Sequence, residues 1–428
     1  MSSPNRRTFL TTAAAAGSLT ALTAAGAADA PNERIRVAVM GVNGRGRALL
    51  NEFSAINNVE VAYICEVDRN VVPRALRSLN QRHRARPQVE KDIRRVLEDR
   101  TLDALIVSAP DHWHALATVW ACQAEKHVYV EKPVSHNVVE GRRMVQAARR
   151  YNKVVQVGTQ RRSADHFTTA KEFVEADKLG KIPFVRTWIA GDRPNIGHVR
   201  DAASAPEGVD YDLWLGPAPR RAFNANRFHY KWHWHWDYGT GEIGNNGIHA
   251  LDMVRGIMNL GDPIRINCGG GKFFYDDDQQ TPDTQIATFD FSETTVIWEH
   301  RVWSKTGFAD APWGLALYGE KGTMIFDNRG WRIVDGRNNL EGAANSDGQM
   351  QTKHVQNFLD CIRNNRRPNA DIEEGHLSTR LCHLGNIAYR TRKTLTFNAQ
   401  NENFGRDDVA NRLLSRTYRA PFALPEIS

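Results

Sequence analysis

The chain has 428 residues, of which 41% are hydrophobic and 25% are charged, and this is the composition of a globular protein large enough for two domains. Its formal net charge of +7 is too small and too scattered to indicate a nucleic-acid partner. Beyond the first thirty residues no apolar run reaches the ~18–20 residues that span a membrane, so we expect no membrane span in the mature protein.

Residues 1–30 have the pattern of an export signal. The pair Arg6-Arg7 stands shortly before Phe9 and a long, mildly apolar stretch rich in Ala, Leu and Thr, which ends in small residues near Ala27 or Ala30. This pattern resembles a twin-arginine signal, which exports proteins that have already folded, often around a cofactor. We therefore expect a periplasmic or otherwise exported protein, the alternative being an Ala-rich arm with no targeting role.

The five cysteines show no close pairing of the kind that binds a metal, since the nearest two are Cys361 and Cys382. Cys65 and Cys122 lie in apolar stretches, where a buried small hydrophobe is the better interpretation. An exported protein could still oxidise some of them. We predict no metal site.

From residue 34 a regular pattern begins with the strand-like "IRVAVM". The turn "GVNGRG", a helical stretch and a second apolar run, "VEVAYIC", follow, and together these segments predict a βαβ unit. In dinucleotide-binding units the first glycine makes the tight turn, the second allows backbone to approach the pyrophosphate, and the third lets helix pack on strand. Gly41 and Gly46 occupy the first and third places, Asn43 stands in the second, and Gly44 and Arg45 lie between. We predict that these five residues border the cofactor phosphates.

Acidic residues follow the second strand. Glu66 lies twenty residues beyond Gly46, where a carboxylate can bind the adenosine ribose, and Asp68 is close behind it. The pattern favours NAD over NADP. Arg69 could instead meet a 2′-phosphate, so NADP is possible, and the two acids could also be solvated strand-end residues.

The alternation of strands and helices continues to residue 158 and predicts a doubly wound parallel sheet. Ligands of such sheets bind beyond the carboxyl ends of the strands. The side chains expected there, at the nicotinamide end of the cofactor, are those of Pro110, Asp111, His114, Glu131, Lys132, Gln160, Arg161 and Arg162.

With "PDHWH", "YVEKPVS", "NNGIHALD" and the closing "RTYRAPFALPEI", the chain resembles the Gfo/Idh/MocA superfamily (glucose–fructose oxidoreductase, inositol dehydrogenase, MocA) over nearly its whole mature length. The resemblance implies an α/β protein with a Rossmann NAD(P)-binding domain over residues 31–158. It also implies a C-terminal α/β domain over residues 159–428, with a large, mostly antiparallel open sheet that commonly forms the interface of a homo-oligomer. β-branched and aromatic runs between turn residues after position 180 are compatible with such a sheet.

The resemblance also assigns catalytic roles. It implies that Lys132 lies beside the nicotinamide and polarises the reacting oxygen, and that His249 is the general base, a role that suits an imidazole. Family members usually carry an aspartate one helical turn before this histidine. This chain has Asn245 there, which can orient the ring but offers no negative charge, with Glu242 and Asp237 as possible substitutes.

The segment "FHYKWHWHWDYGTGE" interleaves histidines with tryptophans. One hypothesis is a carbohydrate wall, in which the indoles, Trp236 among them, stack on a sugar while the histidines and Asp237 bind its hydroxyl groups. Arg161 and Arg162 are further predicted substrate residues. The second is an extended strand that packs its tryptophans into the core and leaves its histidines exposed. A metal site is a third possibility without support from any zinc-type spacing.

These patterns predict an exported NAD(P)-dependent oxidoreductase that acts on a sugar, cyclitol or glycoside and holds its cofactor tightly. Two alternatives stay open. One is a glycoside-cleaving enzyme that oxidises its substrate transiently and eliminates the aglycone. The other is a non-catalytic sugar-binding protein.

Overall fold

Two β-sheets organise the protein. The computed structural model describes residues 34–80, 83 and 85–427, so the predicted export signal lies outside the described residues. From Ile35 onward the chain forms one compact unit. The boundary between residues 158 and 159 stays a prediction, although the strands of the first sheet end at Val157 and those of the second begin at Phe184.

The first sheet has six parallel strands in the order β3-β2-β1-β4-β5-β6. This confirms the predicted doubly wound parallel sheet. The strands are β1 (Ile35–Met40), β2 (Val59–Cys65), β3 (Gln88–Glu90), β4 (Ala104–Val107), β5 (His127–Val130) and β6 (Val155–Val157). The helices that alternate with them are α1 (Arg45–Ala55), α2 (Val72–Arg77), α3 (Ile93–Leu97), α4 (Asp111–Gln123) and α5 (Val138–Arg150).

Each face of this sheet has its own core, because successive side chains of a strand point to opposite faces. Ala38 and Leu105 belong to one buried cluster, and Val37, Val39 and Ile106 belong to another. Strands that are covered on both faces read as continuous apolar runs, and β4, "ALIV", is buried throughout. The runs visible in the sequence therefore determine this sheet directly.

The second sheet has nine strands in the order β14-β13-β12-β11-β7-β10-β9-β8-β15. Among the described strands of this second sheet only β10 and β7 pair in parallel, which confirms the mostly antiparallel sheet. The strands are β7 (Phe184–Ala190), β8 (Arg265–Gly271), β9 (Thr284–Asp290), β10 (Thr295–Arg301), β11 (Trp313–Gly319), β12 (Gly322–Asp327), β13 (Gly330–Val334), β14 (Ala343–Asn345) and β15 (Leu395–Thr396).

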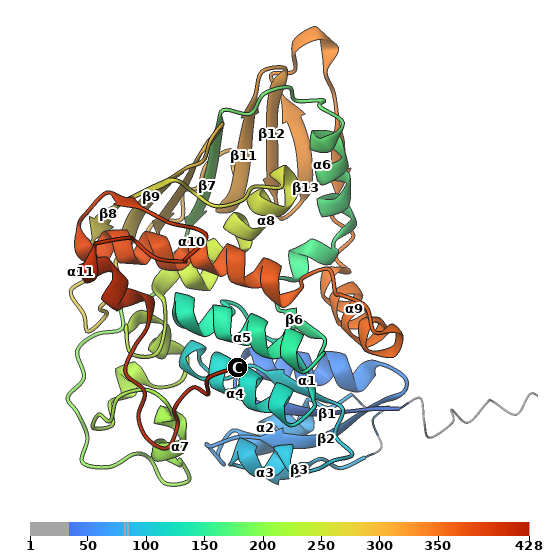
Figure 1. Ribbon diagram of the computed structural model, residues 1–428, viewed down its shortest axis with the longest axis vertical. Helices are drawn as coiled ribbons and strands as arrows, with labels where there is room; N and C mark the ends of the chain where they lie inside the picture. Colours follow the sequence, from blue (N-terminus) through green and yellow to red (C-terminus); the bar gives the residue numbers. More distant parts are fainter. Residues whose placement is uncertain (1–33, 81–82, 84, 428) are drawn as a thin grey trace, which may run out of the picture. The chain divides into compact units, whose positions relative to one another are not determined.

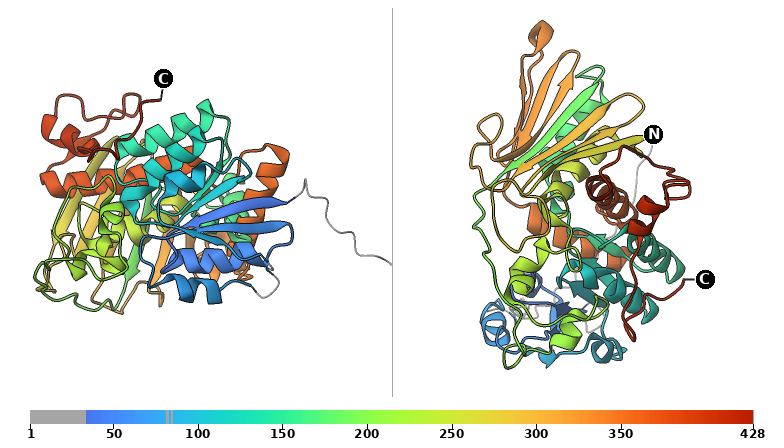
Figure 2. Two further views of the ribbon diagram at one scale, coloured as in Figure 1. Left: turned by 90° about the horizontal axis from the view of Figure 1, so that it is seen from below. Right: turned by 90° about the vertical axis from the view of Figure 1, so that its left-hand side faces the viewer.

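Helices α6 (Asp165–Glu175) and α8 (Ile248–Met258) lie against one side of the second sheet (Figure 1, Figure 2). The long helix α10 (Ile372–Thr391) runs between the two sheets and contacts both α5 and β8 (Figure 1). The remaining helices are α7 (Tyr211–Leu215), α9 (Met350–Asn364) and α11 (Asp408–Asn411). Among the described residues, none of the helices combines the length and hydropathy needed to span a bilayer.

The histidine- and tryptophan-rich segment is not an extended strand. Residues His229–Trp234 form a 3₁₀ helix, η4, and the next residue, His235, is buried. The prediction of a strand with exposed histidines is therefore wrong. A second irregularity follows, because Ile243–Gly247 form a π-helical turn, η5, that leads directly into α8.

Candidate active site

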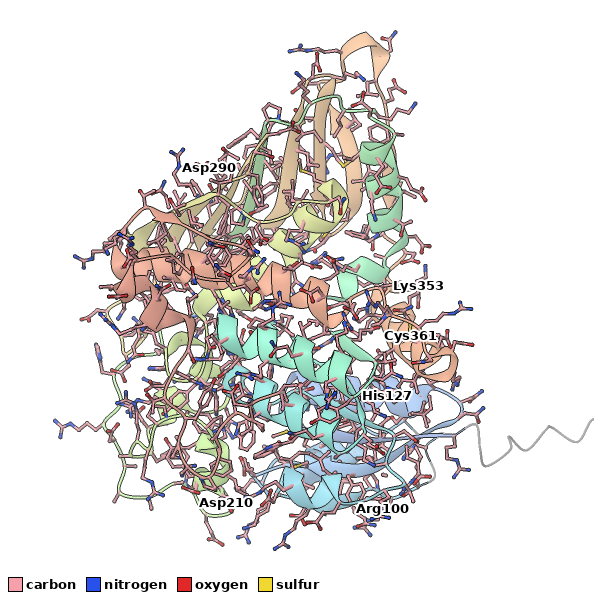
Figure 3. The ribbon with its side chains drawn as sticks, viewed as in Figure 1. Arg100, His127, Asp210, Asp290, Lys353 and Cys361 are labelled. Carbon is pink, nitrogen blue, oxygen red and sulfur yellow. The ribbon has the colours of Figure 1, made fainter. Side chains whose placement is uncertain are left out.

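A cavity of about 270 Å³ lies at the carboxyl end of the first sheet. Its wall is made by the residues that follow β1, β2, β4 and β5, together with Leu213 and Trp214, part of η4, and Asn245. Another lining residue, Lys91, donates a hydrogen bond of 2.7 Å from Nζ to Oδ2 of Asp210, which Figure 3 labels beside α7. The residues after β4 and β5 thus converge on one cavity as predicted, whereas Gln160, Arg161 and Arg162, which follow β6, are not among its lining residues.

The glycine turn after β1 has the geometry that a dinucleotide phosphate needs. Gly41 has a φ of +80°, and a Cβ on it would lie 2.8 Å from the backbone nitrogen of Ala109. A Cβ on Gly46 would lie 1.7 Å from the carbonyl oxygen of Gly41, so this glycine is what allows α1 to pack on the turn. Gly44, the N-cap of α1, has open space around it and no side-chain cap, which leaves the helix amide groups available for a phosphate.

The carboxylate after β2 is held in place by backbone amides. Oε2 of Glu66 accepts from the amide of Val42 at 2.8 Å, and Oε1 accepts from the amide of Asp68 at 3.0 Å. Burial raises the pKa of Glu66. Arg69, which could have met a 2′-phosphate, pairs instead with Glu207 at 2.5 Å. A ribose hydroxyl, rather than a phosphate, fits this arrangement, as in NAD.

Lys132 and Asn245 meet at the cavity wall. Nζ of Lys132 donates to the carbonyl oxygen of Asn245 at 2.8 Å and to its Oδ1 at 3.1 Å. Nδ2 of Asn245 donates to Oε2 of Glu242 at 3.4 Å, and Glu242 in turn pairs with Arg193 at 2.9 Å. The asparagine of the motif therefore positions the lysine.

We expected Asn245 to orient His249, and neither hydrogen bond of its side chain reaches that histidine. The physical reason is the π-helical turn over Ile243–Gly247, in which neighbours along the axis are five residues apart rather than four. His249 itself is half-buried, and its Nδ1 has no hydrogen-bond partner among the residues that the structure describes. Burial and the nearby Lys132 ammonium hold the pKa of His249 well below its usual value, so the ring is neutral.

A further imidazole, that of His233, borders the cavity; the sequence suggested it only as one of the histidines of a carbohydrate wall. Its Nδ1 lies 2.5 Å from the carbonyl oxygen of Tyr230. Because a carbonyl only accepts, Nδ1 carries the proton, and Nε2 is left as a bare acceptor. Burial, with Lys132 and Arg193 nearby, lowers the pKa of His233 to about 3. The alternation of residue types in this segment was visible in the sequence, but its 3₁₀ winding was not.

Most of the predicted cofactor residues border the cavity, and some do not. Those that do are Gly41, Asn43, Gly44, Arg45, Glu66, Pro110, Asp111, His114 and Glu131. Gly46 acts through packing, Asp68 accepts a hydrogen bond from Nε2 of His229 at 2.9 Å, and Gln160 lies in the 3₁₀ turn after β6. Lys132 and Asn245 border the cavity, whereas His249 does not.

The four predicted substrate residues lie outside the cavity lining. The guanidinium of Arg390 lies 5.1 Å from the ring centre of Trp236, and Asp237 pairs with Arg221. The guanidinium of Arg161 lies 3.7 Å from the ring centre of Trp313. Nε of Arg162 lies 2.9 Å from both carboxylate oxygens of Asp252. The aromatic residues of η4 that do face the cavity are Tyr230 and Trp232.

Within residues 34–80, 83 and 85–427, no group of three or more His, Cys, Asp or Glu side chains is arranged to hold a metal ion. The cysteines of this part of the chain are all unpaired.

A parallel sheet whose glycine turn, ribose-side carboxylate and strand-end lysine open into one cavity defines a dinucleotide-dependent oxidoreductase. Comparison with known families agrees. Residues 35–159 match the description "Oxidoreductase family, NAD-binding Rossmann fold", and residues 197–424 match "Oxidoreductase family, C-terminal alpha/beta domain". The chain belongs to the Gfo/Idh/MocA oxidoreductase family, and its cofactor is NAD.

Individual relatives are distant. The chain is 27% identical over 169 residues, 39% of its length, to the uncharacterized oxidoreductase YrbE of Bacillus subtilis, of which the alignment spans 48%. It is 30% identical over 125 residues to a glycosyl hydrolase family 109 protein of a Shewanella species, covering 28% of this chain and 27% of the relative. The chain thus spans half or less of these curated relatives.

Among solved structures, the WlbA dehydrogenase of Bordetella pertussis in complex with NADH and UDP-GlcNAcA has a TM-score of 0.64 to this chain. The two are 18% identical, and the match covers 85% of this chain and 99% of WlbA. A likeness at this identity shows the shared fold.

Proposed function

We propose that this chain is an exported oxidoreductase that acts on a sugar, cyclitol or glycoside. The observation that carries the proposal is the arrangement of Lys132 at the cavity wall. An ammonium group has three N–H donors, and two of them are engaged by Asn245. The third N–H group is available to a substrate oxygen, and the two hydrogen bonds to Asn245 fix its direction.

Bound NAD supplies the hydride acceptor or donor for a carbon that carries a hydroxyl or carbonyl group. The side chains of the chain then have separate tasks. Lys132 hydrogen-bonds the reacting oxygen and stabilises the charge that develops on it. His249, neutral because of burial near Lys132, lies outside the cavity lining, so as the general base it receives the alcohol proton through a group at the cavity.

The wall formed by η4 favours a hydroxyl-rich substrate. Trp232 and Tyr230 offer aromatic surface for the C–H faces of a sugar ring, and Nε2 of His233 offers an acceptor for a hydroxyl group. A Cβ on Gly239 would lie 2.7 Å from Cα of His233, so a glycine at this position lets the chain pack closely behind the histidine.

Export rests on the pair Arg6-Arg7 and the uncharged stretch after it. Because twin-arginine export carries folded proteins, we propose that NAD enters the chain before export and stays bound. One substrate then regenerates the cofactor state that another consumes.

The test uses the mature chain, purified, dialysed and denatured, with the released nucleotide identified and quantified. We expect NAD(H) at close to one per chain. The intact protein is then mixed with a panel of aldoses, cyclitols and 4-nitrophenyl glycosides while the absorbance of reduced nicotinamide is followed. A chain that releases no nucleotide, or whose bound cofactor responds to no member of the panel, would contradict the proposal.

Glycoside cleavage is the second candidate, favoured by a specific observation. Elimination next to a transiently formed carbonyl needs a second proton acceptor, and His233 is a neutral imidazole that borders the cavity. One of the curated relatives is named as a glycosyl hydrolase, which supports glycoside cleavage as a candidate. The two candidates differ in whether bound NAD returns to its starting state within each turnover without a second substrate.

We also propose that the open face of the second sheet joins copies of the chain. Along β9, Ala287 and Phe289 point into the core, and Ile286, which precedes Ala287 and faces the other side of the sheet, is 51% exposed, while Phe184 on β7 is 36% exposed. Sedimentation of the wild-type chain and of Ile286→Asp tests this, with a wild-type monomer as the contradicting result.

A further inference from the structure

Asp111 is a buried carboxyl group of the cavity with an unused oxygen. It is the first residue of α4, it borders the cavity, and it is 1% exposed. Oδ2 accepts a hydrogen bond of 2.9 Å from the hydroxyl of Thr240. Oδ1 has no partner among the other described residues. An ionised carboxylate buried in this way would leave a charged oxygen without compensation, which is costly.

The neighbourhood of Asp111 is built to present this group. A Cβ on Gly244 would lie 1.8 Å from Oγ1 of Thr240, so only glycine at position 244 leaves room for the hydroxyl. Nδ2 of Asn386 holds the carbonyl oxygen of Thr240 at 2.7 Å. The first glycine of "GNNGIH" thus directs the Thr240 hydroxyl at Oδ2 and leaves Oδ1 free.

Three other titratable groups act on Asp111 from the elements around it. The ammonium of Lys132, after β5, favours the ionised form, while the carboxyl of Glu140 on α5 opposes it. Cys382 on α10 is the third, with its thiol pKa raised by burial. Burial outweighs the lysine and raises the pKa of Asp111 to about 8.

We propose that Asp111 is a catalytic proton donor of this site, whose Oδ1–H group serves a substrate oxygen opposite Lys132. The proposal rests on the proposed oxidoreductase function. When a carbonyl substrate is reduced, a C–H bond forms with the hydride that NADH supplies, and the C=O π pair moves to oxygen. That oxygen takes the proton from Oδ1, and the resulting carboxylate is stabilised by Lys132 and the Thr240 hydroxyl. In the oxidative direction the proton returns.

The first experiment is infrared difference spectroscopy of the full chain as purified, with its cofactor, in H₂O and in D₂O. We expect a carbonyl stretch of a protonated carboxyl group at neutral pH, which shifts in D₂O and fades as the pH rises past about 8. The band should be missing in Asp111→Asn and displaced in Thr240→Val, which removes the hydrogen bond to Oδ2. Asp165→Asn is the matched control, because Asp165 is also the first residue of a helix, α6, but is exposed.

The second experiment uses the panel compound that reduces bound NAD. The oxidised form of this compound is added to the protein with bound NADH, and the rate at which NADH is reoxidised is measured. We expect Asp111→Asn to lower the rate of this step about 100-fold with little change in KM, and Asp111→Glu to recover part of it. Absence of the band at neutral pH, its persistence in Asp111→Asn, or an unchanged rate in that variant would overturn the proposal. If Asp111→Asn does not fold, the pH dependence of the wild-type band and the Thr240→Val shift still decide it.

The spectrum needs no substrate, so the two proposals fail separately. A chain with the band but with no response to the panel contradicts the oxidoreductase function and, with it, the catalytic role of Asp111. A chain that turns over a sugar without the band contradicts Asp111 alone.

Discussion

The cavity is made by two regions that relate to the sequence in different ways. At the carboxyl edge of the first sheet, Gly41, Glu66 and Lys132 lie where their distance from a strand end predicts. In the segment from η4 to α8, the residues at the cavity include Trp232, His233 and Asn245, whereas Trp236 and His249 lie outside its lining. In a regular strand, the direction of a side chain follows from its place in the sequence, whereas a 3₁₀ or π turn changes the direction in which the following side chains point.

The largest expected effect is on stability and concerns Arg162. The sequence predicted this arginine as a substrate residue, whereas in the structure it pairs with Asp252. Asp252→Ala should lower the free energy of unfolding by about 3–5 kcal/mol, because it leaves the buried guanidinium without its carboxylate. Glu374→Ala, which removes a half-exposed partner of the same arginine, should cost far less. Denaturant unfolding measures both. If Asp252→Ala leaves the free energy of unfolding unchanged and raises KM, the result would support the predicted role of Arg162 in binding the substrate.

Lys132→Ala tests the edge of the first sheet. Loss of one oriented donor at the reacting oxygen should lower turnover at least ~100-fold and leave NAD bound. Steady-state rates and nucleotide content are compared with those of Lys393→Ala, which removes a surface ammonium paired with Asp407. Normal turnover in Lys132→Ala would mean that the catalytic site lies elsewhere.

Two variants of the glycine turn after β1 distinguish a glycine that is needed for the packing of α1 from a glycine that leaves space for a phosphate. Gly46→Ala should destabilise the protein by about 1–3 kcal/mol, because its Cβ would overlap the carbonyl oxygen of Gly41. A Cβ on Gly44 would meet no atom of the other described residues within 4 Å, so Gly44→Ala should leave stability close to wild type. Thermal unfolding of the two proteins gives the difference. Equal stability would show that α1 can move away from the turn.

Two tryptophan variants test which side chains of the segment from η4 to α8 face the cavity. Trp232 borders the cavity and Trp236 packs under Arg390, so Trp232→Ala should raise KM for the substrate about tenfold, or roughly 1.4 kcal/mol. Trp236→Ala should leave KM nearly unchanged. A raised KM in Trp236→Ala with an unchanged KM in Trp232→Ala would support the carbohydrate wall that the sequence suggested, in which Trp236 stacks on the sugar.

The smallest effect is expected from Asn245→Asp. A carboxylate here would offset the Lys132 charge that helps to hold the pKa of His249 down. That pKa should rise, and the acidic limb of the pH–rate profile should move to higher pH by up to about one unit, or ~1.4 kcal/mol. An acidic limb that stays in place, or moves to lower pH, would show that residue 245 does not act on His249.

The sequence by itself determined the α/β class, the parallel first sheet and the NAD-binding turn, because these depend on local periodicity and on residues close to strand ends. It also predicted the mostly antiparallel second sheet, through the family resemblance. Lys132, predicted as catalytic, borders the cavity, and its catalytic role stays a prediction. We expected Asn245 to orient His249, whereas its side chain bonds Lys132 and Glu242. Only the tertiary structure placed Nζ of Lys132 on Asn245.

Tertiary structure alone also decided which face of η4 meets the cavity, that Arg162 pairs with Asp252, and that Gly244 makes room for the hydroxyl on Asp111. Each of these contacts joins side chains from elements far apart in the chain. Their geometry depends on the winding of irregular turns and on the packing of α10 between the two sheets, and neither has a periodic signature in the sequence.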